Sequence, residues 1–319
     1  MEGHGDVSGA TPALARVVVV GSANVDVVTQ VERFPLPGET VHGSSVTYGL
    51  GGKGLNQTMA AALAGVHAAL VAAVGDDVHG RMLLDGLRAA GVDVLGVDVL
   101  DVPTGSAHIV VDAAGANQIV VVAGANGALT SDLVLSHQAL LTGSDVLVVQ
   151  GEAALAGTLA AVRAARAAGV RVVVNLAPVL PVGPEVMLAA DPLVVNEVEA
   201  AALLDTTAPR SVPEAFDVAA RLAALGPATV IVTLGAQGAV VLDGVSPPVH
   251  VPAPAADRVV DTTGAGDALV GVLAARLAAG AALVEAVRDA VRAATATVGV
   301  AGAAASYPPF AQLLDLGPR

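Results

Sequence analysis

The 319-residue chain has no cysteine and no tryptophan, and only two tyrosines and three phenylalanines. The lack of cysteine excludes disulfide bonds, thiolate metal ligands and a cysteine nucleophile, and it fits a cytoplasmic protein. Because hydrophobic residues still make up 54% of the chain, the core must consist mainly of Ala, Val and Leu. The chain also lacks the GxxxxGK[ST] pattern of a P-loop and the GxGxxG pattern of a dinucleotide site. These absences exclude a P-loop enzyme and argue against a dinucleotide-dependent dehydrogenase.

Basic side chains are scarce. The chain carries 15 Lys and Arg against 29 Asp and Glu, which gives a formal net charge of −14. Nucleic acids and anionic membranes bind dense positive surfaces, so we expect neither as a partner. A phosphorylated ligand must instead be held by local dipoles, by individual basic groups and by metal ions.

Apolar runs long enough to cross a membrane are missing as well, although the mean hydropathy is +0.71. The longest apolar window, residues 59–74, contains His67 and predicts a helix, a turn and a buried strand. Residues 1–15 lack the positively charged region of a signal peptide. We expect them to form a disordered polar tail in front of a single domain, residues 16–319.

The most informative pattern is Asp261-Thr262-Thr263-Gly264-Ala265-Gly266-Asp267, which precedes an apolar helical run beginning at Ala268. Backbone N–H groups at the start of a helix bind anions, assisted by the helix dipole. A carboxylate beside such a site repels the anion unless it has a chemical task. The obvious task for Asp267 is to accept the proton of a hydroxyl that attacks a phosphoryl group. The alternative is an ordinary acidic residue in the first turn of a helix.

A second glycine-rich segment lies far upstream, at residues 48–57. It contains Lys53, the only lysine of the chain, between glycines. Because arginine serves at almost every other basic position, this lysine suggests that a compact ammonium group is needed here; the alternative is chance placement. The glycines let the backbone close on a small polar ligand, and Asn56 adds an amide that can donate and accept.

Strand and helix patterns alternate along most of the chain. Continuous runs typical of strands buried on both faces occur at residues 16–22, 68–74, 145–149, 170–175, 193–196 and 229–233. Helical patterns occur at residues 155–168, 213–225, 268–279 and 283–297. This order predicts an α/β fold with a mainly parallel central sheet and helices on both faces.

Ligands of such sheets bind beyond the carboxyl ends of the strands. Polar residues fall at that edge after several predicted strands: Asn24, Asp26, Gln150, Glu152, Asn175 and Asn196. Two segments, residues 31–49 and 102–123, have alternating strand patterns and no long helix. In the second, Asp112–Asn117 predicts a hairpin turn. We expect both segments to form a small β lid over the polar edge; the alternative is a pair of ordinary surface hairpins.

From about Arg16 to Ser306, the chain resembles the ribokinase family of sugar and nucleoside kinases. Besides the two glycine-rich segments, the resemblance is carried by Gly21-Ser22-Ala23-Asn24-Val25-Asp26, Asn175-Leu176-Ala177-Pro178 and Asn196-Glu197-Val198-Glu199. It implies a ribokinase-like fold and an ATP-dependent sugar kinase that phosphorylates D-ribose at its primary 5-hydroxyl. It also implies Mg²⁺ as the divalent cation, K⁺ as an activator and a homodimer formed through the lid.

Other functions remain open. Within the family, the alternatives are a fructokinase or other ketose kinase and a nucleoside kinase, although the few aromatic residues offer little surface for a base. From another class, the alternative is a catalytically silent sugar-binding regulator. The intact Asp267 and the intact glycine-rich segment before it argue against that alternative.

The resemblance also implies roles for individual residues. The base would be Asp267, with the amides of Gly264, Ala265 and Gly266 stabilising the transferred phosphoryl group. The sugar would be bound by Asn24, Asp26, Gly52, Lys53, Asn56, Glu152 and Asp267. The nucleotide would be bound by Asn196, Glu199, Thr233, Leu234, Gly235, Ala236, Gln237, Gly238, Gly266 and Val291. A K⁺ site would be formed by Asp261, Thr263, Thr297, Val300, Gly302 and Ser306.

Two of these residues need a further remark. Glu199 would act by ordering water around Mg²⁺, and the alternative is a solvated acid in the first turn of a helix. Val291 departs from the Asn or His that relatives often have near adenine, a change that should affect nucleotide affinity and selectivity.

Overall fold

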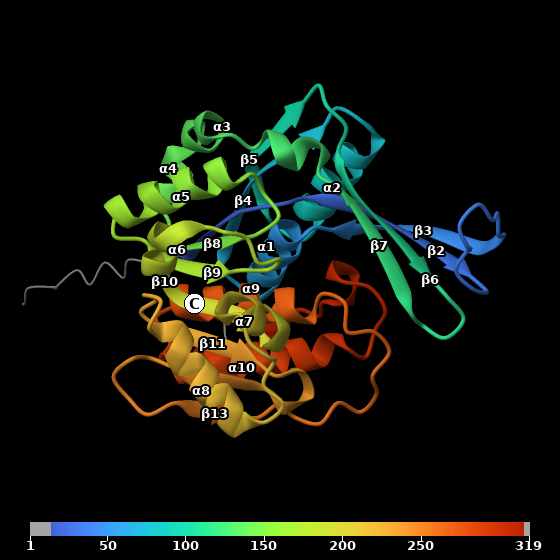
Figure 1. Cartoon of the computed structure of the whole chain (residues 1–319). Coiled ribbons are helices and arrows are strands. Elements are labelled where there is room, and N and C mark those ends of the chain that lie inside the picture. The colour runs from blue at the N-terminus through green and yellow to red at the C-terminus, as the bar shows by residue number, and fades with distance from the viewer. Residues whose placement is uncertain (1–13, 316–319) are drawn as a thin grey trace, which may run out of the picture.

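The computed structural model describes residues 14–315 and has a nine-stranded sheet, a four-stranded sheet and helices on both faces of the larger one (Figure 1). The strands of the large sheet are β1 (Arg16–Val20), β4 (His67–Gly75), β5 (Asp93–Leu100), β8 (Val146–Gln150), β9 (Arg171–Asn175), β10 (Ala190–Asn196), β11 (Val230–Thr233), β12 (Ala239–Leu242) and β13 (Val249–Val251). Their order is β13-β12-β11-β10-β9-β8-β1-β4-β5. All neighbours from β11 to β5 are parallel, whereas β12 runs antiparallel to both of its neighbours, β11 and β13.

Two apolar layers cover the large sheet. One core contains residues of α1 (Lys53–Leu63), α2 (Val78–Ala89), α9 (Ala265–Ala278), α10 (Leu283–Thr297) and α11 (Phe310–Leu313). The other contains residues of α3 (Ser131–Ser136), α4 (Gln138–Thr142), α5 (Leu155–Ala167), α6 (Gly183–Ala189), α7 (Glu197–Leu204) and α8 (Val212–Ala223). Strand residues alternate between the two cores, as in β1, where Val17 and Val19 face one and Val18 and Val20 the other. The predicted α/β fold class is therefore confirmed.

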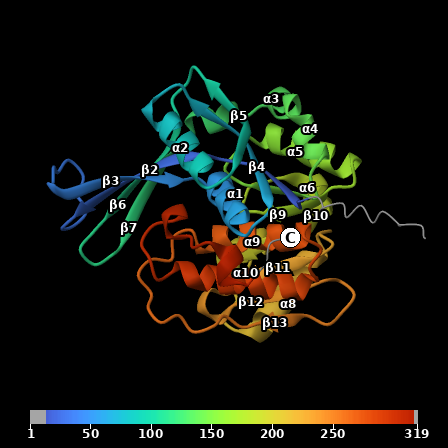
Figure 2. The ribbon, with the colours of Figure 1, turned by 180° about the vertical axis from the view of Figure 1, so that it is seen from behind.

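The four-stranded sheet has the order β3-β2-β6-β7 and consists of β2 (Asn24–Val31), β3 (Gly43–Gly51), β6 (Gly105–Val111) and β7 (Asn117–Val122). It projects from one side of the α/β body, as Figures 1 and 2 show from opposite directions. The small sheet begins earlier in the chain than residue 31, where we expected it to begin, because residues 24–31 form strand β2. Asn24 and Asp26 thus lie on this small sheet rather than on a loop at the edge of the large one. The turn between β6 and β7 is closed by the Asp112 amide, which donates to the Ala116 carbonyl at 3.0 Å.

Most predicted elements lie within a few residues of their expected bounds, but α9 starts three residues earlier than expected. Gly264, with φ of +79°, is its N-cap, and Ala265, Gly266 and Asp267 form its first turn. Three short 3₁₀ helices, Gly124–Ala128, Gly235–Gln237 and Ala304–Ser306, complete the structure. Most of the expected polar tail, residues 1–13, lies outside the described residues. Within residues 14–315, no helix combines the length and the apolar character that a membrane crossing requires.

Candidate active site

Polar side chains from several elements meet at the carboxyl ends of the central strands. The centre of this group is the Asp267 carboxylate in the first turn of α9, which is only 6% exposed. The Asn56 side-chain amide donates to its Oδ2 at 3.0 Å. The Gln57 side-chain amide donates to its Oδ1 at 2.9 Å. Both donors belong to the first turns of α1, so the two glycine-rich segments of the sequence are in direct contact.

Lys53 adds the only ammonium side chain in the protein to this group. Its Nζ lies 4.0 Å from Oδ1 of Asp267, and the lysine side chain is 31% exposed. The negative charge of Asp267 raises the pKa of Lys53 against the opposing effect of burial, and Glu152 and Glu199 act in the same direction. Lys53 is therefore a partly exposed positive charge beside the carboxyl groups of Asp267, Glu152 and Glu199.

The N-terminus of α1 is closed by the protein itself. The Lys53 amide donates to Oε2 of Glu152 at 3.0 Å, and the Leu55 amide donates to the Ser22 carbonyl at 2.8 Å. The Ser22 hydroxyl donates to the same Glu152 oxygen at 2.6 Å. These bonds satisfy amides that a helix start would otherwise leave without a partner. Gly52 and Gly54 permit the approach, because β-carbons there would overlap the backbone of residues 21–24.

The N-terminus of α9 is different. The backbone amides of Gly264, Gly266 and Asp267 have no hydrogen-bond acceptor among residues 14–315. The Ala265 amide, which we expected to be a free donor, donates to the Thr262 carbonyl at 3.2 Å because the chain turns tightly before the helix. A helix start with unpaired amides and a favourable dipole attracts an anion, and here it lies beside a buried carboxylate.

Asn24 and Asp26 extend the site onto the small sheet. Asn24 Oδ1 accepts a 2.7 Å hydrogen bond from the buried Asn126 side chain, whose own Oδ1 accepts from the Ala23 amide at 2.9 Å. The Asp26 carboxyl lies against the Cα of Gly51, where any β-carbon would overlap it. Burial raises the pKa of Asp26 to about 6, and the negative charges of Glu152 and Asp267 contribute in the same direction.

Three buried amide side chains connect Asp267 to the central strands. Gln57 donates to Asn175 Oδ1 at 3.0 Å and accepts from Gln150 at 2.7 Å. Asn175 in turn donates to the Val194 carbonyl at 3.1 Å. The sequence predicts Gln150 and Asn175 at this sheet edge without a specific role, and it does not single out Gln57. Its place next to Asn56 in the glycine-rich segment was the available signal.

Asn196 and Glu199 form a capping box at the start of α7. The Glu199 amide donates to Asn196 Oδ1 and the Asn196 amide donates to Glu199 Oε2, both at 2.8 Å. Glu199 therefore lies in the first turn of α7, as the alternative expects, but it is half-buried and hydrogen-bonded rather than solvated. Glu199 nevertheless interacts electrostatically with Lys53 and Asp267. Burial raises its pKa, and Asp267 acts in the same direction, against the Asn196 amide and Lys53.

The expected nucleotide turn, Thr233 to Gly238, follows β11 and is closed by the Leu234 amide, which donates to the Gly238 carbonyl at 2.8 Å. Gly235, Ala236 and Gln237 are exposed at its tip. Val291 does not fit its expected role, because it is 3% exposed and packs in the core. Helix α10 instead turns Arg292, Thr295 and Ala296 toward a cavity of about 390 Å³ beside residues 254–258.

The expected K⁺ residues come from two segments that the structure brings together. Oδ2 of Asp261 accepts from the Gly302 amide at 2.8 Å, and Oδ1 accepts from the Thr263 amide at 2.9 Å. Burial opposes ionisation of Asp261, but these hydrogen bonds and the Thr263 hydroxyl lower its pKa. The Thr297 carbonyl accepts from the Val300 amide at 3.2 Å, and Ser306 donates to the Ala303 carbonyl at 2.7 Å. Residues 14–315 contain no cluster of three or more His, Asp or Glu suited to a metal ion.

The chain is similar to known proteins over most of its length. The model of the pfkB family of carbohydrate kinases matches residues 14–309. The ribokinase of Mus musculus is 38% identical over 267 residues, which span 83% of this chain and 82% of that protein. The ribokinase of Schizosaccharomyces pombe is 34% identical over 304 residues, 92% and 95% of the two chains. The structure of Arabidopsis thaliana ribokinase complexed with ribose and ATP matches with a TM-score of 0.88 at 30% identity, covering 95% of this chain and 98% of that one.

Proposed function

Because this chain belongs to the pfkB family of carbohydrate kinases, we propose that it transfers the γ-phosphoryl group of ATP to the 5-hydroxyl of D-ribose. One observation carries the proposal. The buried Asp267 carboxylate lies in the same helix turn as the unpaired amides of Gly266 and Asp267. A base for the hydroxyl and donors for the phosphoryl oxygens therefore lie side by side. The ribose specificity rests on the relatives, which are ribokinases.

Asp267 acts as the general base. It accepts the proton of the sugar hydroxyl as that oxygen attacks the phosphorus atom, and a positioned base contributes about 10²- to 10⁴-fold in rate. The amides of Gly264, Gly266 and Asp267 stabilise the charge on the phosphoryl oxygens. Each such donor contributes up to about 3 kcal/mol. The Ala265 amide joins them only if it releases the Thr262 carbonyl.

The sugar pocket is formed by Asn24, Asp26, Gly52, Lys53, Asn56 and Glu152 together with Asp267. Asn56 Oδ1 supports this assignment, because it is buried and has no donor among residues 14–315. A buried acceptor without a donor is costly, and a sugar hydroxyl would satisfy it. Asp26 accepts from two vicinal hydroxyls in this proposal.

ATP is held by the 233–238 turn and by the start of α9, with its phosphates toward Asn196 and Glu199. Mg²⁺ supplies neutralisation of phosphate charge when it is bound. Glu199 fits a role in ordering the water around that ion, since its Oε1 has no hydrogen-bond donor among residues 14–315. Arg292 and Thr295 line the cavity beside α10. In our assignment they replace Val291 as the residues near the adenine ring of ATP.

A K⁺ site between residues 261–263 and 297–306 is also part of the proposal. The Asp261–Gly302 hydrogen bond supports it, because it holds these segments together directly before the start of α9. Carboxylate and carbonyl oxygens suit a hard monovalent ion. The ion would order the loop that carries Gly264 and Gly266.

The small sheet supports a homodimer. Its edge strands β3 and β7 expose apolar residues, among them Tyr48 at 57%, Val120 at 64% and Val121 at 59%. Apolar strands at a sheet edge need covering, and a second copy of this sheet would cover them. Sedimentation at micromolar concentration should give a dimer, and V120E should shift it to monomer; a wild-type monomer would contradict the proposal.

A cytoplasmic location stays part of the proposal, since ATP is the phosphoryl donor.

One experiment separates the candidate functions. ADP formation is measured with ribose, 2-deoxyribose, fructose and adenosine, in the presence of Mg²⁺ and K⁺. We expect the highest kcat/KM for ribose. A preference for fructose or adenosine would indicate another kinase of the family. Ribose binding without ADP formation would indicate a silent sugar-binding regulator.

A further inference from the structure

The two hydrogen-bond donors to Asp267 differ in how firmly they are held. Asn56 has a free carbonyl oxygen, because its Oδ1 has no donor among the described residues. Gln57 is completely buried, and both ends of its amide are engaged. An amide side chain can present either N–H or C=O to a neighbour, so a network must decide which group faces the carboxylate.

For Gln57 that network begins at a backbone atom. The Val194 carbonyl can only accept, so the side-chain amide of Asn175 must turn its N–H toward it and its oxygen toward Gln57. Gln57 Nε2 then donates one hydrogen to Asn175 and the other to Asp267 Oδ1. Gln150 fixes the opposite end by donating to Gln57 Oε1. The direction of every bond follows from the backbone of β10.

The charged surroundings of Asp267 explain why such a donor is needed. Lys53 lies 4.0 Å away, and three further groups interact with Asp267 electrostatically: Asp26, Glu199 and Tyr307. Two of these are carboxyl groups, and the charge of Asp267 raises the pKa of each of them. Neutral N–H donors stabilise the ionised carboxylate without supplying a proton or pairing it permanently with a cation.

We propose that Gln57 is a positioning residue for the reaction: its N–H group holds the Asp267 carboxylate in one rotamer, and Gln150 and Asn175 hold Gln57. This inference rests on the proposed function of Asp267 as the base. Asn56, whose Oδ1 has no donor among the described residues, remains able to accept a hydrogen bond from the sugar. Gln57 contacts the base and has no surface for substrate, so its effect falls on kcat rather than on sugar binding.

The test compares Q57L and Q57E with T58V as the matched control. Thr58 is the next residue of α1, is equally buried, and uses its hydroxyl on the Gly54 carbonyl at 2.7 Å. We expect Q57L to lower kcat by about 10- to 100-fold, the value of one hydrogen bond to a charged group. The acidic limb of its kcat–pH profile should shift to higher pH by about one unit. The ribose Kd, measured by calorimetry, should change less than about threefold.

Q57E keeps the shape of the side chain but brings a second carboxyl group against Asp267. The acidic limb of its kcat–pH profile should therefore move to higher pH than that of Q57L. Q150L should move it in the same direction by less. T58V should keep the wild-type profile. The inference is overturned if Q57L retains the wild-type limb, if kcat falls equally at every pH, or if T58V behaves like Q57L. Should Q57L not fold, Q57E gives the same readout. A wild-type protein that forms no ADP with any sugar would overturn the proposed function itself.

Discussion

The hydroxyl of Tyr307 donates a 2.8 Å hydrogen bond to the carbonyl oxygen of Gly264. Gly264 is the N-cap of α9, and a β-carbon on it would lie 2.7 Å from the Cα of Ala303. The segment that contains Ala303 and Tyr307 is thus packed against the helix start that we assign to the phosphoryl group. Burial raises the pKa of Tyr307 well above its usual value, with the negative charge of Asp267 contributing, so the hydroxyl remains a donor at physiological pH.

Tyr307→Phe removes this donor and leaves the Gly264 carbonyl without its partner. We expect a loss of about 1–2 kcal/mol in the free energy of unfolding and a KM for ATP that rises more than the KM for ribose. Urea unfolding and steady-state kinetics measure the two effects. Tyr48→Phe is the control, because the other tyrosine of the chain is 57% exposed. Equal behaviour of the two variants would contradict a role of Tyr307 at the helix start.

Asp267→Asn should nearly abolish turnover. The asparagine keeps the size of the side chain but cannot accept a proton, so we expect kcat to fall about 10²- to 10⁴-fold. The amides of α9 are unchanged, and ribose binding should stay measurable by calorimetry. A variant with more than half of the wild-type kcat would remove Asp267 from the mechanism.

Much of this site could be predicted from the sequence because its residues lie in short patterns. The run from Asp261 to Asp267 combines glycines with two aspartates, and the segment around Lys53 combines glycines with one lysine. Parallel strands bring their loops to one edge. The contact of Gln57 with Asp267 was not predictable in this way. It depends on the packing of α1 against α9, which no local pattern contains. The hydrogen bond of the Ala265 amide and the burial of Val291 depend likewise on exact backbone positions.

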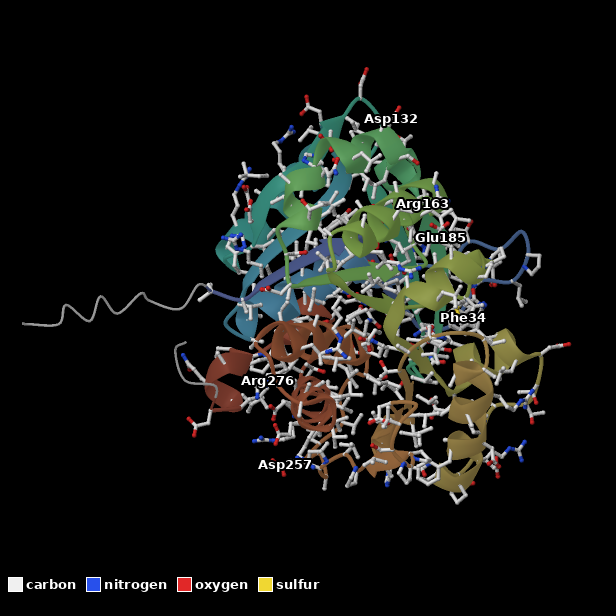
Figure 3. The ribbon with its side chains drawn as sticks, turned by 90° about the vertical axis from the view of Figure 1, so that its left-hand side faces the viewer. Phe34, Asp132, Arg163, Glu185, Asp257 and Arg276 are labelled. Carbon is white, nitrogen blue, oxygen red and sulfur yellow. The ribbon has the colours of Figure 1, made fainter. Side chains whose placement is uncertain are left out.

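The ion pair between Arg276 of α9 and Asp289 of α10 should contribute to stability. Its Nε and Oδ2 atoms are 2.9 Å apart, and the side chains are only 13% and 15% exposed. Arg276→Ala leaves Asp289 with the more distant Arg292 alone, and we expect a loss of about 2–3 kcal/mol in the free energy of unfolding. Arg163→Ala is the matched control. Figure 3 shows Arg163 beside Glu185. Their side chains are 64% and 38% exposed, so the loss of Arg163 should leave the unfolding midpoint unchanged.

Gly51→Ala should disturb the sugar pocket without touching the phosphoryl site. The new methyl group would overlap the Asp26 carboxyl and displace it. Because displacements of about 1 Å can cost about 100-fold in rate, we expect kcat/KM for ribose to fall at least tenfold. Gly49→Ala is the control, since a β-carbon there would lie 4.0 Å from the Asp26 β-carbon. A similar loss in both variants would mean that β3 tolerates no side chain at either position.

Asp26→Asn should separate the function of this carboxyl group from its effect on stability. The pKa of Asp26 is raised from 3.8 to about 6, chiefly by burial, so the folded state binds a proton that the unfolded chain releases between these values. Wild-type stability, measured without sugar, should therefore fall as pH rises from about 4 to 6. Asparagine removes this dependence, and the variant should be more stable than wild type at pH 8 by about 1–3 kcal/mol, with the difference vanishing below about pH 4. Its ribose Kd should rise because a carboxylate acceptor is lost. Urea unfolding at several pH values measures the stability, and a variant less stable than wild type at pH 8 would show that Asp26 supports the small sheet rather than its ligand.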